Sequence, residues 1–590
     1  MFRVIRSPQG HWHVLAEQHH LPPGWEVVEY CETRAEACQH IAGQGHPLLT
    51  TPPLSSGLDF PSLLLLANHD PHSYRVNLQH LHYSALLEHT TELVPDKPCI
   101  SGEGSTLTFA EVQEQVGRIS GHLRRWGVRK GSHVVLVGER NTEYFLCLLA
   151  ILRAGAVYIP VDPDLPANRI QAIMQSLHDP WAIDLTGDLH HLSRLNCTRL
   201  VFSDLTSSQA GLVTQPEALQ GYDLAYIIFT SGSTGSPKGV KIHHGGMINH
   251  IVAKTLDLEL TQKDTLAQTA SQSFDISIWQ FLTGPLLGAH TVIYSTPLVH
   301  HPLRLLDHIR RDRITVLESV PTLIRTTIQY LRKLTQPLAL NDLRCLMLTG
   351  EPLSRLLCEQ WFELYPHIPI INAYGPTECS DDVTHHHVSL HTLGQEGEQI
   401  PLGHVLTGLN LHVCDEHLQP LLPGSTGVLY VSGAGVGYGY LNNLEKTLEH
   451  FLPNPFNTGE DYVLYHTGDQ VQLHLDRRLT FIQRVDQQVK FRGYRIELTE
   501  VEDTVAHVPG VVAAAALVAE LQGRQHLVCF FTHDHDTPPA EDAIKHHCQQ
   551  HLPDYMVPTL CIALPTMPTL YNGKLDRNAL MQQASQLVTQ

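Results

Sequence analysis

The sequence predicts an α/β fold with a large N-terminal core, a small mobile α+β C-terminal domain and a short α+β segment at the start. Short apolar runs alternate with helical stretches, a pattern typical of α/β proteins. The chain has 590 residues, too many for one compact core, which favours two to four folding units. After Asp486 the pattern changes to short alternating strands, which predicts a separate small domain.

The first α/β unit begins with a predicted helix between Thr108 and Gly127. Thr108 and Glu111 form a capping box, apolar residues follow at helical spacing, and Gly127 is typical of a helix end. The apolar run at 134–137 is short enough to be a buried parallel strand, and a second helical stretch follows it. Further strand-like runs, each followed by a glycine- or proline-marked turn, lie at 224–229, 314–317 and 343–348.

Two changes in composition predict the domain boundaries. Residues 47–80 hold five prolines among serines and glycines, which predicts a linker with little regular structure. This linker separates an N-terminal segment, 1–46, from the large core, 81–485. The C-terminal domain, 486–590, is predicted from strand-like runs and a polar helical stretch at 511–518, 527–531 and 540–551.

Composition excludes several classes of partner. The formal net charge is -20, which argues against a nucleic-acid-binding surface, and the longest apolar runs are far too short to span a membrane. The 12 cysteines are scattered and no apolar signal core follows the start, which indicates a reducing cytoplasm. The 41 histidines, including His385–His387, lack the paired spacing of a structural zinc site, so we expect them to be exposed and without a dedicated role.

The strongest functional signal is a phosphate-binding loop. The apolar strand Leu224–Phe229 leads into the hydroxyl- and glycine-rich run Thr230–Gly235, and Lys238 follows. Glycines allow a close backbone approach, so the loop offers N–H groups, hydroxyls and one cation to phosphate oxygens. The spacing differs from that of a Walker loop.

This loop resembles that of the adenylate-forming superfamily, and within it the amino-acid adenylation domains of nonribosomal peptide synthetases. The resemblance covers about residues 85 to 585, and the family's other motifs appear in order: Leu107–Val112, Leu152–Pro163, Phe274–Ser277, Asn372–Glu378, Tyr465–Asp469 and Asn572–Arg577. It implies an enzyme of peptide antibiotic or related secondary-metabolite biosynthesis. Such an enzyme joins an amino acid to AMP, using ATP and Mg²⁺, and transfers the acyl group to the phosphopantetheine thiol of a carrier protein.

The resemblance also implies the role of each site residue. It assigns Lys574 to the substrate carboxylate and the α-phosphate as the catalytic cation, Glu378 to Mg²⁺, Asp486 to the domain hinge and Gly493 to a loop facing the carrier arm. The positions assigned to ATP are Thr230, Ser231, Gly232, Ser233, Thr234, Gly235, Lys238, Gly350, Glu351, Asn372, Tyr374, Thr377, Asp469 and Arg484.

The positions that line the family's amino-acid pocket predict a cationic substrate. They are Asp275, Ile276, Trp279, Glu318, Met347, Thr349, Ala373, Asp381 and Asp382, together with Lys574. Asp275 is assigned to the substrate α-ammonium, which leaves Glu318, Asp381 and Asp382 without a partner. Because buried like charges repel and lose solvation, a guanidinium or ammonium would supply the missing partner. A planar guanidinium engages two carboxylates at once, so we expect arginine first and lysine or ornithine next.

A second resemblance concerns the start of the chain. Residues 2–41, with Pro22–Trp25, are similar to an MbtH-like protein, the small partner that helps many adenylation domains fold. The usual Ser-x-Trp-Pro reads His13–Ala16 here, and Trp25 is expected to form half of the apolar pocket for the adenylation domain.

Two alternative functions remain at this stage. An acyl- or aryl-CoA ligase of the same superfamily is disfavoured because Asp275 provides a carboxylate for an α-ammonium. A non-catalytic binding protein is disfavoured because Lys238, Glu378, Asp469 and Lys574 are all present. No Gly-Gly-x-Ser string follows Lys574 in these 590 residues, so the carrier is expected in trans.

Overall fold

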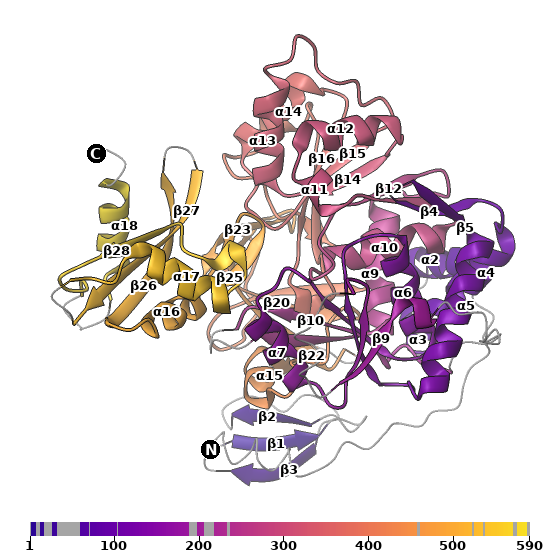
Figure 1. Cartoon of the computed structure of the whole chain (residues 1–590), viewed down its shortest axis with the longest axis horizontal. Coiled ribbons are helices and arrows are strands. Elements are labelled where there is room, and N and C mark those ends of the chain that lie inside the picture. The colour runs from indigo at the N-terminus through magenta and orange to yellow at the C-terminus, as the bar shows by residue number, and fades with distance from the viewer. Residues whose placement is uncertain are drawn as a thin grey trace.

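A computed structural model describes the chain in thirteen segments. These are residues 2–6, 12–16, 26–31, 59–69, 71–102, 104–187, 197–205, 218–232, 237–456, 461–521, 524–534, 537–569 and 575–586. They form a large α/β part and a smaller α+β C-terminal part, which confirms the predicted fold class (Figure 1). Every described helix is too short or too polar to span a bilayer.

The first sheet of the large part contains six described strands in the order β11–β10–β7–β6–β8–β9. Adjacent strands within this sheet are parallel, except that β10 and β11 form an antiparallel hairpin. The predicted helix is α5 (Phe109–Trp126), with the Thr108–Glu111 capping box in place and Gly127 in the left-handed region. The remaining elements are β6 (His133–Val137), α6 (Thr142–Arg153), β7 (Val157–Val161), α7 (Ala167–Ser176), β8 (Trp181–Asp184), β9 (Thr198–Val201), α8 (Phe202–Leu205), β10 (Leu224–Thr230) and β11 (Lys238–His243).

The second sheet has nine described strands in the order β18–β17–β16–β15–β14–β12–β13–β4–β5. The six strands from β16 to β4 are parallel, and antiparallel strands complete both edges. The strands are β4 (Pro98–Gly102), β5 (Ser105–Thr108), β12 (Thr265–Gln268), β13 (His290–Ile293), β14 (Val316–Ser319), β15 (Cys345–Leu348), β16 (Ile370–Tyr374), β17 (Thr384–Val388) and β18 (His404–Val405). The helices between them are α9 (His244–Asp257), α10 (Ile276–Leu287), α11 (Thr296–Val299), α12 (Pro302–Arg311), α13 (Pro321–Leu331) and α14 (Arg355–Leu364).

A third, antiparallel sheet completes the large part. It has the order β19–β20–β22–β21, and β23 also pairs with β22. Its elements are β19 (Leu409–Cys414), β20 (Thr426–Gly433), α15 (Leu444–His450), β21 (Phe451–Pro453), β22 (Val463–Leu473) and β23 (Leu479–Arg484).

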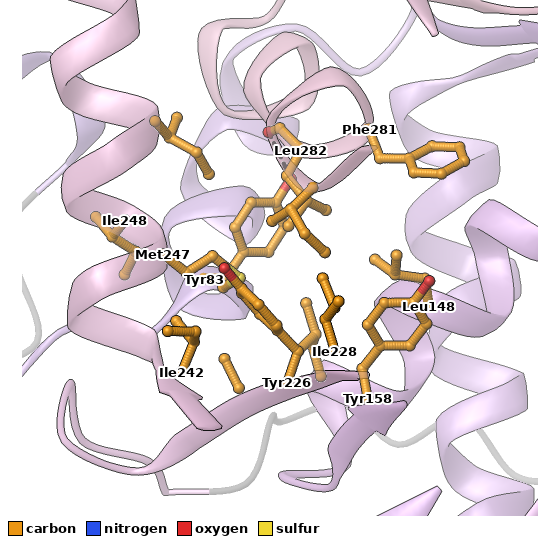
Figure 2. Close-up of a cluster of buried hydrophobic side chains, with 14 of the residues drawn as sticks. Tyr83, Leu148, Tyr158, Tyr226, Ile228, Ile242, Met247, Ile248, Phe281 and Leu282 are labelled. Atoms are coloured by element: carbon orange, nitrogen blue, oxygen red, sulfur yellow. Dashed lines mark hydrogen bonds between the residues drawn. The ribbon is translucent and has the colours of Figure 1, made fainter. Parts of the chain in front are cut away.

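The largest apolar core fixes α9 and α10 against the first sheet (Figure 2). Figure 2 shows Tyr226 and Ile228 of β10 beneath Met247 and Ile248 of α9 and Leu282 of α10. The hydroxyl of Tyr83, in α4 (Tyr83–Leu93), donates to the Leu282 carbonyl at 2.8 Å, so this buried polar group is satisfied. Burial of this many large side chains holds both helices rigidly, and α10 carries Ile276 and Trp279 of the predicted pocket.

The C-terminal part forms its own apolar cores from β24 onward. A two-stranded hairpin of β24 (Gln488–Phe491) and β25 (Tyr494–Glu497) precedes a sheet of order β26–β27–β28. The other elements are α16 (Leu498–Ala506), β26 (Val511–Leu521), β27 (Arg524–His533), α17 (Glu541–His551), β28 (Leu560–Ala563) and α18 (Arg577–Gln586). Asp486, the predicted hinge, lies between β23 and β24 and binds Arg484 at 2.7 Å.

The prediction of an irregular linker at 47–80 is wrong for its second half. Residues of this segment form α2 (Phe60–His69) and α3 (Pro71–Leu78), and the buried side chains of Phe60, Leu63 and Tyr74 join the main core. Two of the prolines that suggested a linker stand at the starts of these helices, where proline costs no hydrogen bond.

The histidines of β17 also differ from the prediction. His385 and His386 are 3% and 7% exposed, and both contact carboxylates: His385 forms ion pairs, and His386 lies 2.9 Å from Glu396. His385 binds Asp257 at 2.7 Å and Asp382 at 3.1 Å. Burial opposes protonation, but these two hydrogen bonds raise the pKa of His385 to about 9, so this side chain is a buried cation at neutral pH.

Candidate active site

The two ends of the phosphate loop lie against carboxylates of the C-terminal domain. Thr230 ends β10 and pairs with Lys238 of β11, while Ser233, Thr234 and Gly235 fall outside the described residues. The Gly232 amide donates to Glu500 at 3.0 Å, and the Lys238 ammonium lies 2.8 Å from Glu497. The loop thus presents an N–H donor and a cation to two oxyanions, which fits its predicted use as a phosphate site.

A buried ion pair joins Glu378 to the same domain. Glu378, in the short 3₁₀ turn η2 (Thr377–Cys379), is 2% exposed. One of its oxygens lies 2.8 Å from Arg495, and the other accepts the Tyr440 hydroxyl at 2.7 Å. Burial raises the pKa of this carboxyl, but the guanidinium and the hydroxyl outweigh burial and lower it to about 2. Glu378 is therefore an ionised carboxylate that already binds a cation.

The residues predicted to hold adenosine form a compact group. Tyr374, at the end of β16, donates its hydroxyl to Asp469 of β22, and Arg484 lies 2.6 Å from the other Asp469 oxygen. The Asn372 amide donates to the Pro401 carbonyl at 2.7 Å. The ammonium of Lys490, on the small domain's hairpin, lies 5.0 Å from the centre of the Tyr374 ring.

Gly350 and Glu351 occupy the turn after β15. Gly350 has φ of +80°, and a Cβ there would lie 3.1 Å from the carbonyl oxygen of Gly493. The Glu351 carboxylate accepts the amide and the hydroxyl of Thr322 at 3.0 and 2.7 Å, which orients its backbone. The hairpin of the small domain therefore contacts this turn directly.

Asp275 lies at the start of α10, where its side chain accepts the Ile276 amide at 3.0 Å. Burial and the nearby Asp381 raise the pKa of this carboxyl to about 7, although the Thr377 side chain favours its charged form. A bound cation would stabilise the charged form of this carboxyl and offset the effect of burial. This property fits the prediction that Asp275 receives an α-ammonium.

The three acidic pocket residues do converge, but they are not free of a partner. Lys254 of α9 is fully buried, and its ammonium lies 2.8 Å from Asp382, 3.3 Å from Asp381 and 3.4 Å from Glu318. It also lies 4.3 Å from the centre of the Trp279 ring. The prediction of three unpartnered carboxylates is therefore wrong, because a lysine from another helix reaches them.

One lysine does not neutralise the whole cluster. Burial raises the pKa of Glu318 and of Asp381, and Lys254 compensates this only in part. The pKa of Asp382 is lowered instead, because Lys254 and His385 together outweigh its burial. The Oδ1 atom of Asp382 has no hydrogen-bond partner among the described residues. The carboxylates of this cluster therefore still lack part of the positive charge, and one of the hydrogen-bond donors, that would stabilise them.

The remaining pocket positions form the apolar wall. Trp279, Met347 and Ala373 share one small buried cluster, against which Ile276 is packed. Thr349 is buried, and its amide donates to the Ser319 carbonyl at 3.1 Å. Two further predicted residues, Lys574 and Trp25, also lie outside the described residues.

Sequence reasoning missed Lys254, Arg495, Glu497 and Glu500. A signal for Lys254 was present, since it interrupts the apolar face of α9 one turn after His250. Nothing local marked the other three, which acquire their partners only when the small domain contacts the large one.

The comparisons with known proteins agree with this geometry. The sequence matches the AMP-binding enzyme family over residues 87–441 and the AMP-binding enzyme C-terminal domain over 500–574. It is 33% identical to tyrocidine synthase 2 of Brevibacillus parabrevis over 522 residues, and 32% identical to bacitracin synthase 3 of Bacillus licheniformis over 509. These matches cover 88% and 85% of this chain but only 14% and 8% of the two relatives.

Solved structures show the same arrangement. A holo NRPS protein containing adenylation and PCP domains, bound to a vinylsulfonamide inhibitor, superposes with a TM-score of 0.76 at 26% identity, over 86% of this chain and 85% of that one. The Vibrio cholerae adenylation domain AlmE shares the fold, with a TM-score of 0.72 at 23% identity, over 92% and 100% of the two chains. The converging motifs, the two matched family regions and the shared fold show that this chain belongs to the AMP-binding enzyme family.

Proposed function

We propose that this chain uses ATP to activate an amino acid with a cationic side chain, arginine first and lysine or ornithine next. It then transfers the aminoacyl group to the phosphopantetheine thiol of a carrier protein in trans. Support for this chemistry comes from the NRPS protein with adenylation and PCP domains that the fold resembles. Further support comes from Asp275, whose raised pKa suits a carboxyl that receives an α-ammonium.

The donor set fits ATP and Mg²⁺. The Gly232 amide and Lys238 already bind two carboxylates, so they suit the oxygens of a triphosphate. Glu378 is a hard, ionised oxygen ligand, and Mg²⁺ prefers one or two such carboxylates together with phosphates. When bound, Mg²⁺ supplies positive charge that offsets repulsion between the phosphates and the substrate carboxylate. Because Glu497, Glu500 and Arg495 occupy these groups, ATP binding and this docking of the C-terminal domain exclude one another.

A single observation carries the choice of substrate, namely the unbalanced acidic cluster. Lys254 and His385 stabilise the charge of Asp382, whereas the pKa of Glu318 and of Asp381 stays raised. A substrate guanidinium or ammonium would let both ionise, and its N–H groups would supply a donor to the vacant Oδ1 of Asp382. A neutral side chain would leave these groups unpaired.

We expect ATP–pyrophosphate exchange to be fastest with arginine, then with ornithine and lysine. Citrulline is the sharpest comparison, because it copies the shape of arginine without its charge. A hydrogen bond to a charged group contributes about 1.5–3 kcal/mol, so citrulline should be about 10- to 100-fold poorer in kcat/KM. A preference for an apolar or acidic amino acid, or equal use of citrulline and arginine, would contradict the proposed substrate.

We also propose that the N-terminal segment is an intramolecular MbtH-like partner. Its described strands, β1 (Phe2–Arg6), β2 (Trp12–Ala16) and β3 (Glu26–Cys31), form an antiparallel sheet of order β2–β1–β3. Strand β2 contacts β21 of the large part, and Figure 1 shows this sheet below α15. A small sheet seated on the adenylation core suits a partner that supports folding.

Deletion of residues 1–46 tests this partnership. We expect lower soluble yield or slower exchange, because the surface around β21 loses its cover, and a free MbtH-like protein added in trans should restore part of the loss. The full-length chain with the same added protein is the control and should not change. Unaltered yield and exchange after the deletion would show that the segment only extends the chain.

A further inference from the structure

Lys254 stands out among the described residues because it is a fully buried lysine that no assigned motif contains. It projects from α9, whose residues Met247 and Ile248 are fixed in the main core (Figure 2). Its ammonium contacts the acidic cluster and lies over the Trp279 ring. Burying an ammonium is costly unless several carboxylates compensate, so this lysine is held in one place.

We infer that Lys254 is a specificity-determining residue of the amino-acid pocket, which supplies a fixed internal cation and limits the length of side chain that the pocket accepts. This inference rests on the proposed activation of cationic amino acids. It explains how the same pocket would select among their side chains by charge and by length.

The contacts of Lys254 with the carboxylates explain how the limit would arise. Asp275, proposed for the α-ammonium, interacts electrostatically with Asp381 and Asp382. The Lys254 ammonium lies between Asp381 and Glu318, at 3.3 and 3.4 Å. Because the ammonium contacts all three carboxylates, a substrate side chain that enters this cluster meets the lysine there. Lys254 thus competes with the substrate cation and bounds the pocket.

The surroundings leave Lys254 little freedom to move aside. The Trp279 indole donates to Glu318, and Gln280 donates to the same oxygen at 3.4 Å, so Glu318 is anchored. His250, one turn earlier on α9, places its Nε2 atom 3.0 Å from Asp381. His385 binds the same Asp382 oxygen as Lys254, at 3.1 Å. A substrate must accommodate the lysine where it stands, rather than displace it.

The charge is tested by Lys254→Met, which keeps nearly the length of the side chain and removes its cation. The pocket then lacks its internal cation, so the ratio of kcat/KM for arginine over citrulline should rise about tenfold. Lys254→Arg is the matched control, because it keeps the charge. Its larger side chain affects arginine and citrulline alike, since the two have the same shape, so this ratio should stay within about twofold. An unchanged ratio in folded Lys254→Met would overturn the proposed charge role.

The length limit is tested by the double variant Lys254→Ala/Asp382→Asn. It removes both partners of the closest ion pair, so neither charge is left buried without the other. The double variant is therefore expected to fold even where Lys254→Ala alone does not. The vacated space should raise the ratio of arginine over ornithine about tenfold, because the longer side chain gains contacts. A folded double variant with the wild-type ratio would refute the length role.

These outcomes separate the inference from the proposed function. If wild-type enzyme prefers a non-cationic substrate, the proposed substrate class fails, yet both ratios still report whether Lys254 selects among side chains. If wild-type enzyme prefers arginine and neither ratio changes in the folded variants, Lys254 is only structural and the inference fails alone. An equal loss with all substrates would likewise show a structural role.

Discussion

Lys574→Ala is expected to reduce ATP–pyrophosphate exchange by about 100- to 1000-fold, since loss of one well-placed donor costs about 2.7–4 kcal/mol of transition-state stabilisation. The family resemblance assigns Lys574 to the substrate carboxylate and the α-phosphate, where negative charge accumulates. The other cations described at the phosphate site, Lys238 and Arg495, contact different groups and cannot replace it. Exchange should be measured at saturating ATP and amino acid.

A matched lysine of the same domain provides the control. Lys545 of α17 is part-exposed and binds Glu541 and the Thr559 carbonyl, both at 2.8 Å, away from the phosphate site. Lys545→Ala should therefore exchange at close to the wild-type rate. Circular dichroism and the melting temperature establish that both variants are folded. Wild-type exchange in folded Lys574→Ala would remove the catalytic role from this residue.

Gly493→Leu is expected to reduce loading of a separately prepared holo-carrier protein about 100-fold and to leave pyrophosphate exchange nearly unchanged, because small displacements of reacting groups have large effects on rate. A Cβ at Gly493 would lie 2.6 Å from Cγ1 of Val320, which is an overlap, so the hairpin could not dock as described. The resemblance places Gly493 in the loop that faces the carrier arm, which assigns this docking to the transfer step. Loading is followed with a radiolabelled amino acid.

The control for Gly493 must separate overlap from backbone strain. Gly493 has φ of +84°, a region that disfavours leucine in any surroundings. Gly131 has φ of +79° and nothing within 4 Å of an added Cβ, so Gly131→Leu carries comparable strain without the overlap. It should load the carrier normally. Parallel losses of exchange and loading in Gly493→Leu would show general damage and contradict a role confined to transfer.

Local sequence patterns predicted those parts of the fold that depend on neighbouring residues. The helix from Phe109, its capping box and its glycine end were predictable because each depends on contacts within one turn. The same local reasoning misread Pro61 and Pro71, since a proline that opens a helix and a proline in a linker look alike until the helix is buried.

The sequence by itself determined the family, because its motifs have short spacings and stand in the family's order. The phosphate loop and the three acidic pocket positions are predictions from the same motifs. Only the tertiary structure decided the charge balance of the pocket. Lys254 is 64 residues from Glu318 and 127 from Asp381, and His385 of β17 becomes a buried cation through Asp382 and through Asp257 at the end of α9. Ion pairing between distant segments depends on how helices and strands pack together, which no local pattern encodes.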